Sequence, residues 1–100
     1  MDIIKMKKIE LIVPKSLEEE VIDILRKIET GFSLVDEVRG MGKSGLRDGI
    51  GLTDAFQNVL FIIIVPQERL TFTVEKLCPI YNKYGGLLAT SDIDIWNDKS

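Results

Sequence analysis

The chain of 100 residues is long enough for one domain, and its content of 45% hydrophobic and 29% charged residues is typical of a globular protein. Its net charge of −3 argues against a general nucleic-acid binder, because phosphate binding draws on clustered lysine and arginine. The chain has no histidine and one cysteine, Cys78, which excludes a Ser-His-Asp triad, a histidine-containing metal cluster and an internal disulfide. These absences disfavour an enzyme and fit a cytoplasmic protein.

The first part of the chain predicts a strand followed by a helix. Apolar and polar residues alternate in part over 7–14, as in a strand with one buried face. Apolar residues then recur at helical spacing over 17–28. Ser16 and Glu19 have the spacing of a capping box, so the Ser16 side chain is expected to cap the start of this helix. Gly31 is expected to end it in the left-handed conformation.

Two further strands flank a glycine-rich segment in the middle of the chain. Residues 32–40 alternate in polarity and predict a second strand. The apolar run at 59–66 is too short for a helix and rich in β-branched residues, which indicates a central strand. The segment at about 40–58 contains five glycines. It is either a neglected surface loop or a flexible loop that is the working part of the protein.

The last part of the chain predicts a helix, a turn and a strand. The helix begins after residue 66, and Pro79 is expected to break or kink it at about Cys78. The glycine pair at 85–86 predicts a turn. Residues 87–96 then predict the final strand.

This order of elements predicts a single α+β domain over residues 1–100. The fold is ferredoxin-like, βαββαβ, with a four-stranded antiparallel sheet and two helices on one face. Both faces of the third strand are nevertheless apolar, one with Phe61, Ile63 and Val65 and the other with Leu60, Ile62 and Ile64. Because large exposed apolar patches are rare on monomers, a homo-oligomer packed through its sheets is expected.

Four short motifs occur in one order: KKIELIVP at 7–14, EVRGMGKSG at 37–45, IIIVPQE at 62–68 and the glycine pair at 85–86. With them, the chain resembles the PII signal-transduction family and its PII-like relatives from residue 7 to about residue 96. The resemblance implies a homotrimer that senses an adenine nucleotide (ATP, ADP or AMP) in clefts between subunits. It also implies that a long T-loop signals to a target, such as a membrane transporter or a metabolic enzyme.

The resemblance further implies two sets of site residues and no catalytic or metal site. The effector-binding set at the loop base and the glycine turn is Gly40, Met41, Gly42, Lys43, Gly85 and Gly86. Glycines allow backbone N–H groups to approach an anion closely, and the Lys43 ammonium is suited to neutralise it. The partner-binding part of the loop is Ser44, Leu46, Arg47, Asp48 and Ile50.

Three features depart from the family pattern. Leu87 follows the glycine turn where the family has a lysine, and no arginine follows the last strand. Residues 40–58 contain no tyrosine, so uridylylation of that loop is not expected. These differences indicate a divergent PII-like protein.

Other side chains allow two interpretations each. Asp92 and Asp94 share one face of the last strand and form either a site for Mg²⁺ or Ca²⁺ or, more commonly, a solvated edge. Trp96 either closes a cleft between subunits or packs within its own chain. Three basic residues recur every four positions around the glycines and form either an anion-binding cluster or a solvated loop surface: Arg39, Lys43 and Arg47.

Two other functions remain open on the same fold. A metal-handling trimer of CutA type is disfavoured by the missing histidine and the isolated cysteine. A small enzyme of the acylphosphatase or isomerase type requires a positioned base or an arginine–asparagine anion cradle, and the sequence shows neither.

Overall fold

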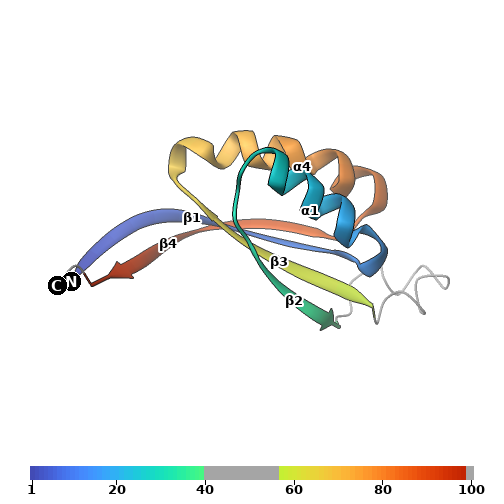
Figure 1. Ribbon diagram of the computed structural model, residues 1–100, viewed down its shortest axis with the longest axis horizontal. Helices are drawn as coiled ribbons and strands as arrows, with labels where there is room; N and C mark the ends of the chain where they lie inside the picture. The colour runs from blue at the N-terminus through green and yellow to red at the C-terminus, as the bar shows by residue number, and fades with distance from the viewer. Residues whose placement is uncertain (40–56, 99–100) are drawn as a thin grey trace.

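A computed structural model describes residues 1–39 and 57–98. Two short 3-10 turns, η1 (Lys15–Leu17) and η2 (Gln67–Arg69), lead into two helices, α1 (Glu18–Lys27) and α4 (Leu70–Tyr84). The strands are β1 (Asp2–Pro14), β2 (Ser33–Val38), β3 (Asn58–Val65) and β4 (Leu87–Asn97). They form one antiparallel sheet in the order β2-β3-β1-β4, with both helices on one face (Figure 1). The predicted ferredoxin-like fold is confirmed.

The core lies between the helices and one face of the sheet. Alternation along β3 places Phe61 in this core, where its ring centroid lies 5.5 Å from that of Phe32. The buried apolar residues are Ile9, Leu11, Val13, Leu17, Val21, Leu25, Val59, Phe61, Ile63, Val65, Leu77 and Ile80. The opposite face, which we call the open face, has no helix over it in the described part of the chain, and Val35 and Ile64 are exposed there. None of the helices in the described ranges is long and apolar enough to cross a membrane.

The start of α1 differs from the prediction. Ser16 lies inside the turn η1, α1 begins at Glu18, and Leu17 at the N-cap position makes no side-chain capping bond. The prediction that Ser16 and Glu19 form a capping box is therefore wrong. An N-cap residue needs an extended backbone, whereas the chain turns directly after Pro14 so that Leu17 can enter the core.

The end of α1 also differs, because Glu29 rather than Gly31 takes the left-handed conformation (φ 54°). The Thr30 N–H donates to the Leu25 carbonyl at 2.9 Å, and the Glu29 N–H donates to the Arg26 carbonyl at 3.0 Å. These two bonds form a Schellman motif, which satisfies carbonyls of the last turn. In this motif the residue with the left-handed conformation is usually glycine, but here it is Glu29.

Glu29→Gly is expected to stabilise the protein by about 0.5–1 kcal/mol. The left-handed conformation costs a non-glycine residue roughly 1–2 kcal/mol, and the greater unfolded-state entropy of glycine offsets part of the gain. Glu29→Ala retains the strain and is the matched control. The two variants are compared with the wild type by urea unfolding; a Glu29→Gly midpoint no higher than that of Glu29→Ala would contradict this account.

The sequence predicted that Pro79 breaks or kinks the second helix, and the structure shows that the helix does not break there. α4 continues through Pro79 to Tyr84, and Cys78 is half-buried within it. Leu77 and Ile80 on either side of the proline are buried in the core. Their burial keeps the helix in place although the proline removes a backbone hydrogen bond.

β1 begins at Asp2, five residues before the alternating stretch at 7–14. Its pairing with β3 begins only at Lys7, whereas its pairing with β4 runs the full length, with Asp2 opposite Asn97. Residues 2–6 and 93–97 therefore form a two-stranded ribbon, which projects from the body and carries both termini at its tip (Figure 1). Trp96, on this ribbon, is 64% exposed, so its own chain covers only a minor part of its surface.

Candidate functional site

The stems of the loop and the glycine turn lie at the same end of the sheet. β1 ends at Pro14, which pairs with Asn58 just after the loop. On its other side, Ile12 of β1 pairs with Leu87, directly after the turn formed by Gly85 and Gly86. Both glycines have positive φ, 83° and 116°, and the predicted turn is confirmed.

The same sheet order keeps the β2 stem and the glycine turn apart within one chain. β2 is at one edge and β4 at the other, with β3 and β1 between them. Since neighbouring strands are about 4.8 Å apart, the two edges are separated by roughly 14 Å. Arg39, the last described residue before the loop, is exposed at the β2 edge. The remaining predicted loop residues lie outside the described ranges: Gly40, Met41, Gly42, Lys43, Ser44, Leu46, Arg47, Asp48 and Ile50.

Lys15 connects both stems of the loop to the body. Its backbone N–H donates to the carbonyl of Gln57 at 2.6 Å, at the end of the loop. Its ammonium donates to Asp36 of β2 at 2.8 Å and to Glu18 of α1 at 2.7 Å. The Asp36 carboxylate also accepts the N–H of Glu37, at 2.8 Å, where a bulge ends the regular pairing of β2. A shallow cavity of about 170 Å³ opens beside it, lined by Pro14, Lys15, Ser16 and Gln57.

Lys15 and Asp36 shift each other's pKa. Hydrogen bonds to Asp36 and then to Glu18 raise the pKa of Lys15 above its usual value of 10.5. The bond from Lys15, followed by that from the Glu37 N–H, lowers the pKa of Asp36 below 3.8. Lys15 was not predicted as a site residue, because its only local signal is its place between a strand-ending proline and an acidic helix start.

Lys15→Met is expected to lower the urea midpoint at neutral pH, and this effect should decrease in acid as Asp36 becomes protonated in the folded protein. Folding lowers the pKa of the Asp36 carboxyl. Its ion pair with Lys15 therefore stabilises the folded protein fully above about pH 3.8, and this stabilisation is lost as the pH falls through the lower pKa that Asp36 has in the folded protein. In alkali the sign is opposite, because folding raises the pKa of Lys15. Its charge stabilises the folded protein fully below about pH 10.5, and this stabilisation is lost as the pH rises through the higher pKa that Lys15 has in the folded protein.

The measurement for Lys15→Met is the urea midpoint of variant and wild type across this acid range, at low and high salt. The substitution keeps the backbone bond to Gln57, so only the ion pairs are tested. A difference between the proteins that persists unchanged in acid would show that the lysine stabilises through packing instead.

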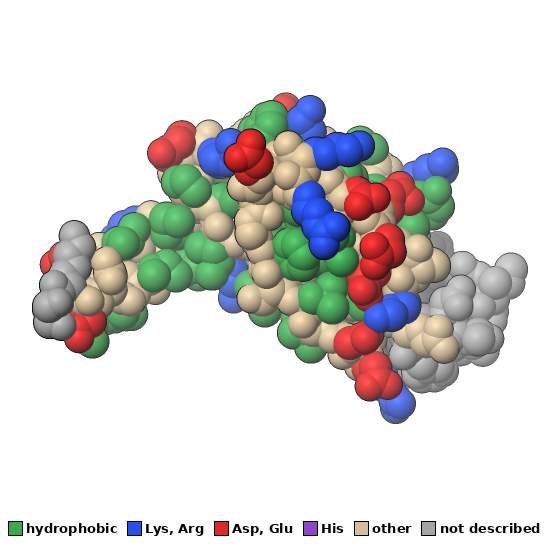
Figure 2. Space-filling view, in the orientation of Figure 1, with side chains coloured by type: hydrophobic (Ala, Val, Ile, Leu, Met, Phe, Trp, Pro, Cys, Tyr) green, Lys and Arg blue, Asp and Glu red, His purple; other side chains and the backbone are tan. Residues whose placement is uncertain are grey.

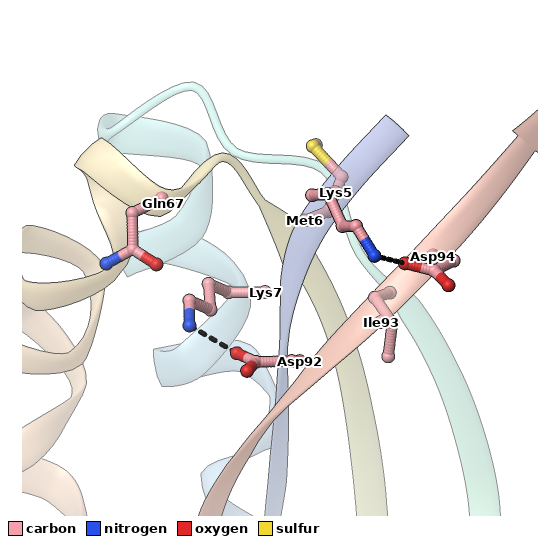
Figure 3. Close-up of a pocket in the computed structure, with 7 residues that line it drawn as sticks. All are labelled: Lys5, Met6, Lys7, Gln67, Asp92, Ile93 and Asp94. Atoms are coloured by element: carbon pink, nitrogen blue, oxygen red, sulfur yellow. Dashed lines mark hydrogen bonds and ion pairs between the residues drawn. The ribbon is translucent and has the colours of Figure 1, made fainter. Parts of the chain in front are cut away.

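A second group of charges lies where the ribbon leaves the body (Figure 3). Asp92 and Asp94 share one face of β4, as predicted, but each is paired across to β1: Lys5 with Asp94 at 3.0 Å, and Lys7 with Asp92. Lys7 lowers the pKa of Asp92. The cavity here, about 410 Å³, is lined by Lys5, Met6, Lys7, Gln67, Asp92, Ile93 and Asp94. No group of three or more potential metal-ligating side chains occurs in the described part of the chain, so a metal site at these aspartates gains no support.

The four-stranded antiparallel sheet with two helices on one face can be compared with protein families and solved structures. The family model "Nitrogen regulatory protein P-II" matches residues 6–95. The chain therefore belongs to the P-II family. The match favours a PII-like protein over the CutA-type and enzymatic alternatives.

Solved structures of PII-like proteins have the same fold. CPII of Thiomonas intermedia K12, bound to ADP and bicarbonate, is 25% identical, with coverage of 94% of this chain and 91% of that chain and a TM-score of 0.77. The same protein bound to ADP, AMP and acetate gives 20% identity, coverage of 97% and 94%, and a TM-score of 0.79. A Thermus thermophilus protein described as PII-like gives 20% identity, coverage of 95% and 93%, and a TM-score of 0.72. No curated protein matches this chain in sequence.

Proposed function

We propose that this P-II family protein is a regulatory sensor of an adenine nucleotide and not an enzyme. The observation that carries the proposal is the family match over residues 6–95, together with ADP bound to the similar CPII. Binding of the nucleotide changes the populations of loop conformations and so the surface offered to a target protein.

The effector site of the proposal lies between two copies of the chain. One copy contributes Gly40, Met41, Gly42 and Lys43, and its neighbour contributes Gly85 and Gly86. The separation of roughly 14 Å between the edges of one sheet supports this division, because a ligand can contact both sets readily when the β2 edge of one copy meets the β4 edge of the next. A closed ring of such heterologous contacts fits a homotrimer.

The open face supports self-association independently of the ligand. Ile64 and Val35 are exposed on it, and Ile62 between them is half-buried although its neighbours Phe61 and Ile63 are in the core. Packing this face against other copies removes apolar surface from water.

The proposed output is binding of the loop to a cytoplasmic target or to the cytoplasmic side of a membrane transporter. The proposed contact residues are Ser44, Leu46, Arg47, Asp48 and Ile50. The absence of tyrosine from residues 40–58 implies that the ligand, rather than uridylylation, sets the signal.

Titration calorimetry with ATP, ADP and AMP tests the sensor function. Lys43→Ala is expected to weaken nucleotide binding about tenfold or more, since a charged hydrogen bond contributes roughly 1.5–3 kcal/mol. Lys27→Ala, on the exposed side of α1, is the matched control and should bind as the wild type does. Absence of heat with all three nucleotides at millimolar concentration would refute the proposal.

A further inference from the structure

The ribbon of residues 2–6 and 93–97 carries apolar side chains on both faces. On the helix side of the sheet, Ile3 pairs with Trp96, and the two are 45% and 64% exposed. On the open-face side, Ile4 is 42% exposed and pairs with Ile95, and Met6 pairs with Ile93. Figure 2 shows hydrophobic side chains gathered along the projecting part of the molecule, with polar and charged groups between them.

A ribbon of this kind gains little support from its own chain. No third strand pairs with residues 3–6 in the described part of the chain, because pairing with β3 starts at Lys7. An isolated two-stranded ribbon is marginally stable in water and needs a further strand or a packed face. The ion pairs of Lys5 with Asp94 and Lys7 with Asp92 hold the base of the ribbon, but its apolar tip lies beyond them.

The charges of the open face indicate what covers the ribbon. Strand register places Ile4, Met6, Lys8, Glu10 and Ile12 on this face, so the apolar side of the ribbon is continuous with it. Between the ribbon and Pro14, β1 carries two charged residues on this face, Lys8 and Glu10. Neither forms an ion pair within the described residues.

This stretch of β1, in which one lysine and one glutamate are flanked by Met6 and Ile12, is complementary to a copy of itself. When two such faces meet, Lys8 of one copy can pair with Glu10 of the other, which would otherwise be buried without a partner. A strongly charged partner would leave one of these two groups opposed by a like charge. The occupant that the charges fit is therefore a second copy of this chain.

We propose that the ribbon is an oligomerisation arm, whose tip is enclosed by a second copy that covers both Ile4 with Ile95 and Ile3 with Trp96. This inference rests on the self-association in the proposed function and adds a defined contact to it. The five residues of each ribbon strand span about 16 Å, which is sufficient to reach past the body onto a neighbour.

Trp96 is the only tryptophan of the chain, so its fluorescence reports on this contact alone. In the assembled wild type, the emission is expected to be shifted to the blue and protected from acrylamide, and dilution should reverse both effects. Ile95→Asp is expected to lower the mass measured by sedimentation about threefold, from trimer to monomer, and to expose Trp96. Circular dichroism establishes that the variant is folded.

The matched control is Phe72→Ser on α4, which removes an apolar side chain of similar exposure (40%) that is covered by Arg69 and Lys76 rather than by the arm. It should change neither mass nor emission. If the wild type is oligomeric but Trp96 is fully accessible to acrylamide, the proposed arm contact is wrong although the trimer is not. An Ile95→Asp protein of unchanged mass would lead to the same conclusion. A monomeric wild type would refute both the arm and the trimer, whereas the nucleotide proposal is tested by calorimetry.

Discussion

Gly86→Ala is expected to destabilise the fold by about 3 kcal/mol or more, and this is the largest effect we expect from a single added methyl group. A Cβ at Gly86 would lie 2.2 Å from the backbone carbonyl oxygen of Ile12, a separation that real Cβ atoms do not adopt. Its φ of 116° is also strained for any residue with a side chain. Since the clashing atom belongs to the backbone of β1, β4 has to move away from the sheet.

Substitution of two other glycines distinguishes the steric clash at Gly86 from the cost of its positive φ. Gly85 has a φ of 83° but no atom within 4 Å of an added Cβ, so Gly85→Ala should cost only about 1–2 kcal/mol. Gly31 has neither positive φ nor a close neighbour, and Gly31→Ala should be neutral or stabilise by about 0.4–1 kcal/mol. Urea unfolding of the three variants measures their free energies of unfolding, which should fall in the order Gly31→Ala, Gly85→Ala, Gly86→Ala. Equal losses at Gly85 and Gly86 would mean that the close approach to β1 does not matter.

The series also bears on function. If the turn binds an anion through its backbone, Gly85→Ala should weaken nucleotide binding while leaving most molecules folded. Gly86→Ala should reduce binding mainly by unfolding the protein. Calorimetry below the unfolding temperature of each variant distinguishes these two causes.

The fold could be predicted because its main signals are local and repeated. Alternation along β3 divided its apolar residues correctly into two faces, and the structure shows that the face with Phe61 is buried while the face with Ile62 is open. The helical spacing over 17–28 likewise identified Val21 and Leu25 as core residues. Burial of apolar side chains is the largest favourable term in folding, and its period follows directly from strand and helix geometry.

The wrong details are those in which packing overrides a weaker local preference. Ser16 has the sequence of a cap, but burial of Leu17 draws it into a turn. Pro79 is a helix breaker, but Leu77 and Ile80 hold the helix on the core. A cap or a single backbone bond contributes about 1–3 kcal/mol, which is comparable with the burial of one large apolar side chain.

Two other features were missed because they depend on residues far apart in the chain. The ribbon exists because residues 2–6 pair with residues 93–97, and neither segment shows this alone. Lys15 is tied to Asp36 and Gln57, which approach it only when the sheet is formed. Of the proposed effector site, only Gly85 and Gly86 lie within the described residues, and the role of all six residues remains a prediction.

Ile62→Asp is expected to convert the oligomer into a folded monomer that no longer binds nucleotide. Ile62 lies on the open face, directly between Glu10 of β1 and Ser33 of β2. In a single chain the new carboxylate remains in contact with water and costs little. In the oligomer it would be buried beside the carboxylate of Glu10, and an unpaired buried charge costs about 3–5 kcal/mol in each copy.

Sedimentation and calorimetry on the same preparations test this result, with Thr71→Asp on the exposed side of α4 as the control for added charge. The control should remain oligomeric and bind nucleotide as the wild type does. An Ile62→Asp protein that keeps its mass would contradict association through the open face. A monomer with unchanged nucleotide affinity would instead place the effector site within one chain, which requires the loop to cross the roughly 14 Å between the β2 and β4 edges. Mass and affinity should therefore fall together, because the site we propose exists only where two copies meet.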